Sequence, residues 1–376
     1  MRKLSWKRAA AWRAHRHHLV ERAPAGSLLT VASRLCGLHA QLLSSAELTA
    51  WARVEGLERT AVHQALWQDR TLVKTWAMRG TLHLLPSSEL PLWHAGLATC
   101  RRYLREAQWI KYFGITLEEL DRVSATIGEV LDNRVMTREE LVSEVVRRTG
   151  SAAFSGNAAA SSWGTVLKPA AFSGVLCFGP NAGTRVQFTR PDTWVKLGPK
   201  IDRDSATAEI TRRFLAAYAP ATVHDLARWW SGGVSEARQW IDSLGNEVSP
   251  VDVEGMQSWM LTGDLREACD LAPKGSVRLL PGFDQYVVGA SWHAANLLPG
   301  DLRARVYRPQ GWISPVLLVN GMIHGVWRHA VTGGRLEVTI EPFVPLFTRL
   351  RRAIAAEAER LAAFLNKPLE LYFSLN

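Results

Sequence analysis

The fold prediction rests first on residues 72–86, which read Leu-Val-Lys-Thr-Trp-Ala-Met-Arg-Gly-Thr-Leu-His-Leu-Leu-Pro. Two strand-like runs flank Arg79-Gly80, so the stretch predicts a β-hairpin that turns at this dipeptide. Helices are predicted before it, over residues 6–20, 30–41, 44–53 and 57–68. Several helices followed by a hairpin is the order of a winged helix-turn-helix module.

The same order of elements recurs twice along the chain. A helix predicted over 117–131 is followed by Thr137-Arg-Glu-Glu140, a capping box that opens the next helix, and by a hairpin over 174–190. Further on, apolar residues at every fourth position from Ile210 form one helical face, and residues 248–261 predict a third hairpin. This recurrence indicates three related winged-helix units.

The chain after residue 276 has a different pattern. It predicts strands joined by tight turns, of which Asn320-Gly321 is the strongest hairpin signal in the sequence. A helix over 346–366 and a strand over 369–373 complete this part. We therefore predict an α+β fold with tandem winged helix-turn-helix domains and a C-terminal α+β region packing on them. The predicted boundaries are 1–115, 116–200, 201–275 and 276–376.

The composition indicates a globular protein with an excess of positive charge. The 376 residues include 45 Lys and Arg against 35 Asp and Glu, for a net charge of +10. Such an excess favours a polyanionic partner, although a solvated basic surface explains it equally well. No apolar run approaches the roughly 18–20 residues that a membrane span needs, and the N-terminus does not resemble a secretory signal. We expect a cytoplasmic protein without a membrane partner.

No pattern in the sequence predicts a metal site. The four cysteines are too far apart for a paired zinc spacing: Cys36, Cys100, Cys177 and Cys269. His15, His17 and His18 cluster near the end of the first predicted helix, and a metal could bind there. Adjacent helical residues point in different directions, however, and the helix dipole favours histidine at a C-terminus. We expect no metal.

Two polar residues interrupt an apolar, small-residue stretch at 35–51. His39 and Gln41 lie within Leu-Cys-Gly-Leu-His-Ala-Gln-Leu-Leu, where an unpaired buried polar group costs roughly 1–3 kcal/mol. His39 and Gln41 must therefore contribute either to the folded structure or to catalysis. The structural alternative is that they bridge the first unit to its neighbour through hydrogen bonds.

Five segments, spread in order over nearly the whole chain, resemble the AlkZ/YcaQ family of bacterial DNA glycosylases. They are Gly37-Leu-His-Ala-Gln41, Leu72–Leu84, Leu279-Leu-Pro-Gly-Phe-Asp284, Tyr307-Arg-Pro-Gln-Gly-Trp-Ile-Ser-Pro315 and Ile340-Glu-Pro-Phe343. The resemblance implies tandem winged-helix domains around a C-shaped, basic concave face that holds duplex DNA. It also implies excision of N7-alkylated purines, including bulky adducts and interstrand crosslinks.

The family's active-site signature is a Gln-any-Gln triplet, or Gln-any-Asp in a sister branch. His39 and Gln41 occupy the matching positions, so the second glutamine is kept and the first is replaced by histidine. An N7-alkylguanine is already cationic, so the enzyme mainly has to place a water and stabilise an oxocarbenium-like sugar. Gln41 could orient that water and neutral His39 could accept its proton. No lysine nucleophile is needed, which predicts a monofunctional glycosylase.

The predicted helix over 30–41 raises a geometric objection to a shared site. Residues at i and i+2 on an α-helix are separated by about 200° of rotation. His39 and Gln41 can therefore act together only if the helix ends or distorts near Gly37. If both lie within a helix, one of them is structural.

Other candidate residues follow from the same segments. Asp284 could be a catalytic carboxylate, although an Asp at this place after Pro-Gly more often forms a turn or caps a helix. Basic residues on or near the hairpins suit phosphate contacts, namely Lys74, Arg79, Arg101, Arg102, Arg185 and Arg190. We expect a monomer that binds double-stranded DNA carrying alkylpurine lesions, without a cofactor. The alternative is a non-catalytic winged-helix regulator, which explains the charge and the repeats equally well.

Overall fold

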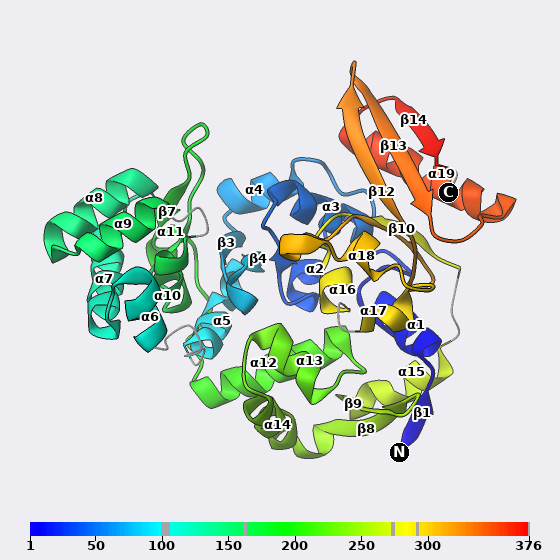
Figure 1. The fold of residues 1–376 in the computed structure, drawn as a ribbon, viewed down its shortest axis with the longest axis horizontal. Helices are drawn as coiled ribbons and strands as arrows, with labels where there is room; N and C mark the ends of the chain where they lie inside the picture. The colour runs from blue at the N-terminus through cyan, green and yellow to red at the C-terminus, as the bar shows by residue number, and fades with distance from the viewer. Residues whose placement is uncertain (99–105, 161–163, 272–274, 291–292, 375–376) are drawn as a thin grey trace. The chain divides into compact units, whose positions relative to one another are not determined.

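The computed structural model describes residues 1–98, 106–160, 164–271, 275–290 and 293–374 (Figure 1). The chain divides into two compact units, each built from segments that are distant in the sequence. The first contains Met1–Val62, Thr211–Leu226 and Ala237–Asn376, and the second contains His63–Ile210 and Ala227–Glu236. Among the described residues, no helix is long and apolar enough to cross a membrane.

A five-stranded sheet is the centre of the first unit. Its strands, in spatial order, are β10 (Val277–Leu280), β11 (Val316–Val319), β12 (Met322–Thr332), β13 (Arg335–Pro342) and β14 (Leu369–Phe373). Neighbours pair antiparallel, except that β13 and β14 are parallel. Asn320 and Gly321 have φ angles of 53° and 82°, the left-handed conformations that a two-residue hairpin turn requires. The predicted turn is confirmed.

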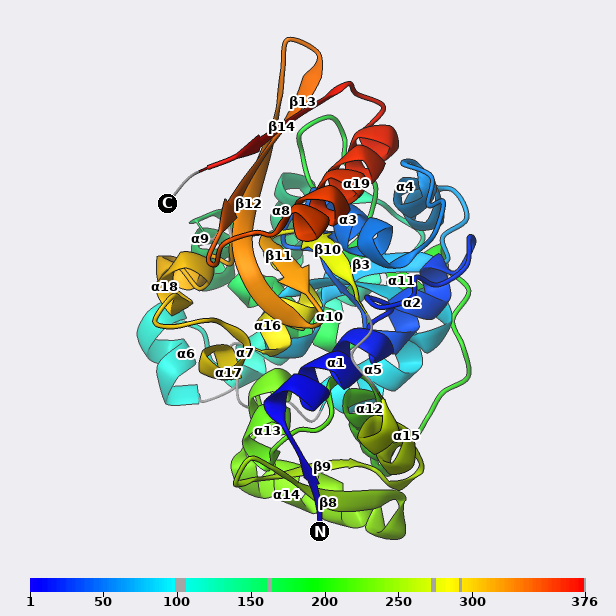
Figure 2. The same ribbon diagram turned by 90° about the vertical axis from the view of Figure 1, so that its right-hand side faces the viewer.

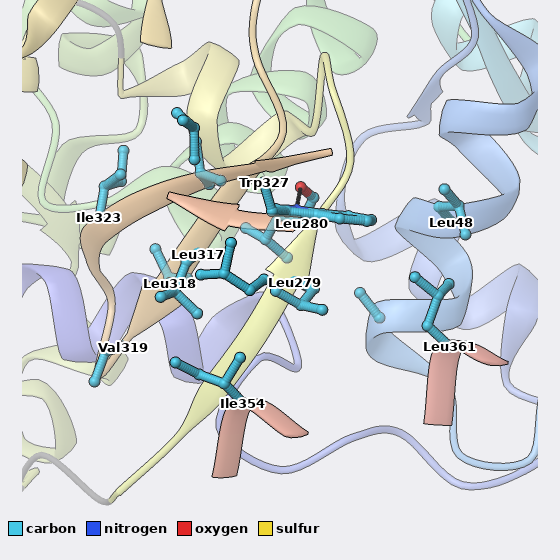
Figure 3. Packing of buried hydrophobic residues seen from close by; sticks show 14 of the residues in the cluster. Leu48, Leu279, Leu280, Leu317, Leu318, Val319, Ile323, Trp327, Ile354 and Leu361 are labelled. Carbon is cyan, nitrogen blue, oxygen red and sulfur yellow. Dashed lines mark hydrogen bonds between the residues drawn. The ribbon is translucent and has the colours of Figure 1, made fainter. Parts of the chain in front are cut away.

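Helix α19 (Thr348–Leu365) lies across this sheet (Figure 2). Ile354 and Leu361 project from it into a core of sheet side chains, which Leu48 joins from α3 (Leu43–Arg53) (Figure 3). Within this core, the indole Nε1 of Trp327 donates a hydrogen bond to the Leu280 carbonyl at 2.8 Å. The predicted last helix and last strand are both confirmed.

The N-terminal segment joins a second, smaller sheet of the first unit. Ser5 caps α1 (Trp6–Arg16) by accepting a hydrogen bond from the Arg8 amide. Ahead of it, β1 (Arg2–Leu4) pairs in parallel with β8 (Val248–Val253), which forms a hairpin with β9 (Met256–Leu261). The third predicted hairpin is confirmed, whereas strand β1 was not predicted. Helix α1 ends earlier than the predicted residue 20, because His18 takes a left-handed φ of 55°.

Short helices complete the first unit. They are α2 (Leu28–Arg34), α15 (Leu265–Asp270), α16 (Gln285–Gly289), α17 (Ala294–Leu297) and α18 (Arg303–Val306), with a two-residue strand β2 (Leu38–His39). Four helices contain residues of both units: α4 (Ala61–Trp67), α12 (Arg203–Tyr218), α13 (Val223–Trp230) and α14 (Val234–Ser243). The apolar face of α12 is confirmed, since Ile210, Phe214 and Tyr218 are all buried.

The second unit contains the first two predicted hairpins. The helices that lie wholly within it are α5 (Leu90–Leu97), α6 (Glu106–Phe113), α7 (Leu117–Val130), α8 (Arg138–Thr149), α9 (Ala152–Ala160), α10 (Lys168–Phe172) and α11 (Pro191–Trp194). Strands β3 (Leu72–Trp76) and β4 (Leu82–Pro86) pair antiparallel, and the strand order β5-β7-β6 unites Met136–Thr137, Gln187–Thr189 and Cys177–Phe178. The capping box of Thr137 and Glu140 is confirmed at the start of α8.

Candidate active site

His39 and Gln41 lie on a non-helical segment between α2 and α3. The predicted helix over 30–41 is wrong at its C-terminal end, because α2 stops at Arg34. Cys36 and Gly37 then take φ angles of 59° and 95°, and the Gly37 amide donates to the Ala32 carbonyl at 2.7 Å. Left-handed residues and a hydrogen bond of this span are typical of a helix end. The rotation of about 200° that helical geometry imposes on residues two apart is therefore absent.

Two buried side chains hold this segment in place. The hydroxyl of Tyr218 donates to the Leu35 carbonyl at 3.0 Å, and Nε2 of Gln285 donates to the Gly37 carbonyl at 2.6 Å. Carbonyl groups at the end of a helix lack intrahelical partners and need such donors when buried. The backbone that presents His39 is thus positioned by residues from two other parts of the first unit.

The His39 ring lies at the inner end of three packed aromatic rings. It stacks on Phe283 with centroids 5.5 Å apart and an angle of 11°, and Phe283 meets Trp312 edge-to-face at 5.0 Å. His39 is 5% exposed, whereas Trp312 is 47% exposed. The three rings therefore run from the protein surface to His39. We refer to Phe283 and Trp312 as the aromatic wall.

Gln41 lies two residues beyond His39 and is half-buried. The described part of the chain contains no hydrogen-bond partner for its side chain. Strand β2 ends at His39, and α3 begins only at Leu43, so Gln41 lies in neither a strand nor a helix.

Asp284 has a structural role. Its carboxylate caps α16 by accepting a hydrogen bond from the Tyr286 amide at 2.9 Å. The same carboxylate accepts two hydrogen bonds from Arg53, each of 2.7 Å. The prediction that Asp284 caps a helix is confirmed, and its fully buried oxygens are occupied by these partners.

A buried histidine lies beneath this site. His17 packs edge-to-face against Tyr218 and Tyr286, with centroid distances of 5.1 and 5.4 Å. The pKa of His17 is well below its usual value, first because the ring is buried and then because Arg53 is close. His17 therefore stays neutral at physiological pH and acts as a core residue.

The described residues include no group of three or more His, Cys, Asp and Glu that could hold a metal ion. The N-terminal histidines have other surroundings. His15 lies 3.4 Å from Glu267, and His17 is enclosed by aromatic rings. The cysteines Cys36, Cys177 and Cys269 are free thiols.

The predicted DNA contacts differ in their surroundings within the second unit. Burial lowers the pKa of Lys74, which lies over the Phe178 ring at 5.2 Å. Arg79, on the hairpin turn, donates to the Trp229 carbonyl at 3.2 Å. Arg190 pairs with Asp132 and Asp192 at 3.0 and 2.6 Å.

The remaining predicted contacts are Arg185, Arg101 and Arg102. Arg185 is exposed at the turn between β6 and β7. Arg101 and Arg102 lie outside the described residues. Of these three residues, the structure therefore describes Arg185 alone.

Sequence reasoning did not assign roles to four residues that shape the site. These are Arg53, Phe283, Gln285 and Trp312. Phe283 and Trp312 lie in two of the segments that carry the family resemblance, so their position there was an available signal. No sequence pattern predicts the ion pair between Arg53 and Asp284, because that contact depends on tertiary packing.

Comparisons with known proteins agree with this fold. A family model described as DNA glycosylase AlkZ-like matches residues 32–364. A Streptomyces sahachiroi protein named interstrand DNA cross-link repair glycosylase is 36% identical over 369 residues, which cover 96% of each chain. The solved structure of Streptomyces sahachiroi DNA glycosylase AlkZ has a TM-score of 0.86 and 35% identity, and covers 98% of this chain and 100% of that one.

The comparisons identify the class of protein as a DNA glycosylase. The chain belongs to the family described as DNA glycosylase AlkZ-like. The resemblance found in the sequence is confirmed, and an enzyme is favoured over a non-catalytic regulator.

Proposed function

We propose that this enzyme hydrolyses the N-glycosidic bond of N7-alkylated purines in duplex DNA, with His39 and Gln41 as its catalytic residues. The observation that carries the proposal is the helix end at Arg34, which leaves both residues on a non-helical segment whose His39 stacks on the aromatic wall. The proposed substrates include bulky adducts. Interstrand crosslinks are included because the Streptomyces relative is named for cross-link repair.

The two side chains supply what a cationic leaving group requires. The Gln41 amide oxygen orients a water molecule, and neutral His39 accepts its proton as the water attacks the anomeric carbon. The alkylated base leaves as a neutral purine, so it needs no general acid. No covalent enzyme intermediate forms, and the enzyme does not cut the DNA strand.

The aromatic wall offers a surface for the lesion. Planar groups stack on exposed aromatic side chains, and Trp312 is the exposed end of this wall. A bulky planar adduct could rest there while its sugar lies near His39. The wall therefore favours large lesions as substrates.

The DNA-binding part of the proposal rests on charge and on the order of elements. In the second unit, helices α7, α8 and α9 with strands β5, β6 and β7 follow the order of a winged helix, and Arg185 lies at the turn of its hairpin. We propose tandem winged-helix domains, with the boundaries predicted from the sequence, and binding by a monomer. Binding through phosphates should weaken steeply with salt.

The direct test is strand scission by heat and alkali of a duplex carrying one N7-methylguanine. We expect an abasic site with the wild type, and a strong loss of product with His39→Ala and with Gln41→Ala. Strands should remain intact without heat and alkali. His63→Ala and Gln64→Ala are matched controls, because both residues are exposed on α4.

Two outcomes would count against the proposal in different ways. Equal product formation by wild type, His39→Ala and Gln41→Ala would exclude these residues from catalysis. Absence of product from N7-methylguanine with every variant would call for a duplex with a bulky N7 adduct or a crosslink. Failure on those substrates as well would overturn the proposed substrate class.

A further inference from the structure

A cavity of about 950 Å³ lies beside α19 in the first unit. One face of the helix, from Phe347 to Arg360, lines it, opposite the ends of β10 and β11 at Val277 and Val319. Ile354 of the same helix points instead into the core (Figure 3). Small-molecule sites have volumes of about 300–1,000 Å³. The cavity has the size of a ligand site, and neither His39 nor Gln41 lines it.

One end of this cavity is positively charged. Arg22 bonds to both carboxylate oxygens of the buried Glu357, and Nη1 of Arg278 lies 3.6 Å from the same group. Glu55 lies 3.8 Å from Arg22 and 3.8 Å from Arg360, but its side chain is 62% exposed. Three guanidinium groups therefore face one buried carboxylate and one that is largely solvated. We call Arg22, Arg278 and Arg360 the arginine cluster.

Two of these arginines donate hydrogen bonds to backbone carbonyls, which carry no negative charge to offset that of the guanidinium group. Arg278 donates to the Val20 carbonyl at 2.9 Å, and Arg360 donates to the Val54 carbonyl at 2.7 Å. Neutral acceptors fix the direction of a guanidinium group but leave its charge in place. The pKa of Arg278 falls to about 10, first because of burial and then because Arg22 is close. The arginine cluster is thus preorganised and keeps an excess of positive charge.

Each arginine of the cluster also has one nitrogen donor without an acceptor. Arg22 Nε, Arg278 Nε and Arg360 Nη1 are buried and have no hydrogen-bond partner among the described residues. Buried donors without an acceptor are rare in folded proteins. The arginine cluster therefore has more donors than acceptors around it, while parts of its side chains stay accessible, with exposed fractions of 11–20%.

Apolar side chains also line the cavity. They include Val277, Val319 and Leu350, which we call the apolar wall, and Phe347, which is 80% exposed. Arg349 in the first turn of α19 adds a cation, and that turn contains no acidic residue. The lining therefore combines the arginine cluster with apolar side chains.

We propose that this cavity binds an organic phosphate of mononucleotide size, with its phosphate at the arginine cluster and its base against the apolar wall and Phe347. Planar guanidinium groups match phosphate oxygens in pairs. A phosphate offers three acceptor oxygens where a carboxylate offers two. The phosphate belongs either to a free nucleotide or to a DNA strand. The inference does not depend on the chemistry at His39 and Gln41.

Titration calorimetry of the full chain with 2′-deoxyadenosine 5′-monophosphate tests this proposal, with deoxyadenosine and inorganic phosphate for comparison. We expect the nucleotide to bind at least about tenfold more tightly than deoxyadenosine, since charge-assisted hydrogen bonds are lost without phosphate. Arg278→Gln should weaken nucleotide binding by about tenfold. Arg360→Gln is the second variant and should have a similar effect, because this half-buried member of the arginine cluster can be changed while the Arg22–Glu357 pair stays in place. Arg352→Ala is the matched control, exposed on the same helix but outside the cavity lining.

The source of the phosphate is decided by a second measurement, the affinity of an undamaged duplex at several salt concentrations. If Arg360→Gln lowers this affinity and reduces the salt slope by about one, the phosphate is that of DNA. If only nucleotide binding falls, the ligand is a free nucleotide. The proposal is overturned if folded Arg278→Gln and Arg360→Gln bind both the nucleotide and the duplex as the wild type does. It is also overturned if the nucleotide binds no better than deoxyadenosine and duplex binding is unchanged.

Discussion

Arg53 and Asp284 form a two-point ion pair in which both side chains are 0% exposed and both hydrogen bonds measure 2.7 Å. Arg53 is the last residue of α3, which follows the segment of His39 and Gln41. Asp284 directly follows Phe283 of the aromatic wall. The ion pair therefore links the two parts of the chain that build the candidate active site.

Asp284→Asn should destabilise the protein by about 3–5 kcal/mol, because it leaves the Arg53 charge buried without a counter-charge. Urea unfolding measures this loss. The double variant Arg53→Met/Asp284→Leu should recover most of the stability, since it removes both charges together. A single variant as stable as the wild type would show that the pair does not hold the fold.

Trp312→Ala should impair the excision of bulky planar adducts more than that of N7-methylguanine. Loss of one stacking partner costs about 1–3 kcal/mol, or roughly 5- to 150-fold in kcat/KM for the bulky substrate. Steady-state kinetics on the two lesions measures the difference. Trp312→Phe should restore part of it, and Tyr372→Ala provides a control at another exposed aromatic residue. Equal losses on both lesions would argue against a stacking role.

Gly321→Ala should destabilise the first unit by about 1–3 kcal/mol or more. Gly321 has a φ of 82°, and an added Cβ would lie 2.5 Å from the Ala10 carbonyl oxygen. Gly333→Ala is a matched control, because Gly333 also has a positive φ but open space around it. Thermal unfolding should therefore show a larger loss for Gly321→Ala than for Gly333→Ala.

Stability should fall as the pH drops from about 6.5 toward 4, in part through His94. Burial lowers the pKa of His94 to about 4, so the unfolded chain binds a proton that the folded chain does not. Above about pH 6.5 the ring is neutral in both states and the protein keeps its full stability. Between pH 7 and 5, protonation of His94 in the unfolded chain lowers the free energy of unfolding by about 2 kcal/mol. Urea unfolding at both pH values should show a smaller loss for His94→Gln than for wild type. His63→Gln, at an exposed site, should behave as the wild type does.

Arg185→Ala should weaken binding to all DNA duplexes to a similar extent and lower the salt slope by about one. Arg185 is exposed at a hairpin turn, a position suited to contact with the DNA backbone. Fluorescence anisotropy with duplexes of different sequence measures the effect. Arg147→Ala is a control, because Arg147 is also exposed but pairs with Glu144 on its own helix. An effect restricted to one sequence would indicate base recognition instead.

Local sequence signals predicted most of the secondary structure. Thr137 and Glu140 form the expected capping box, with hydrogen bonds of 3.3 and 2.8 Å in the two directions. Asn320-Gly321 makes the expected turn. Such features depend on residues within a few positions of each other, so the sequence is sufficient to predict them.

The same reasoning was wrong at the end of α2 and missed strand β1. Apolar residues continue past Arg34, which favours a longer helix, but Gly37 takes a left-handed conformation and ends it. Strand β1 is recognised only through its pairing with β8, which lies far away in the sequence. The helix end is thus a local effect of a glycine at positive φ, whereas strand β1 depends on a tertiary contact.

By itself, the sequence determined the family, the order of helices and hairpins, and the position of the His39-Ala-Gln41 triplet, because each is encoded in contiguous residues. Only the tertiary structure decided that Phe283 stacks on His39, that Asp284 pairs with Arg53, and that an arginine cluster lines a cavity beside α19. These contacts join segments that are distant in the sequence. Their geometry follows from how the whole core packs, which no local pattern specifies.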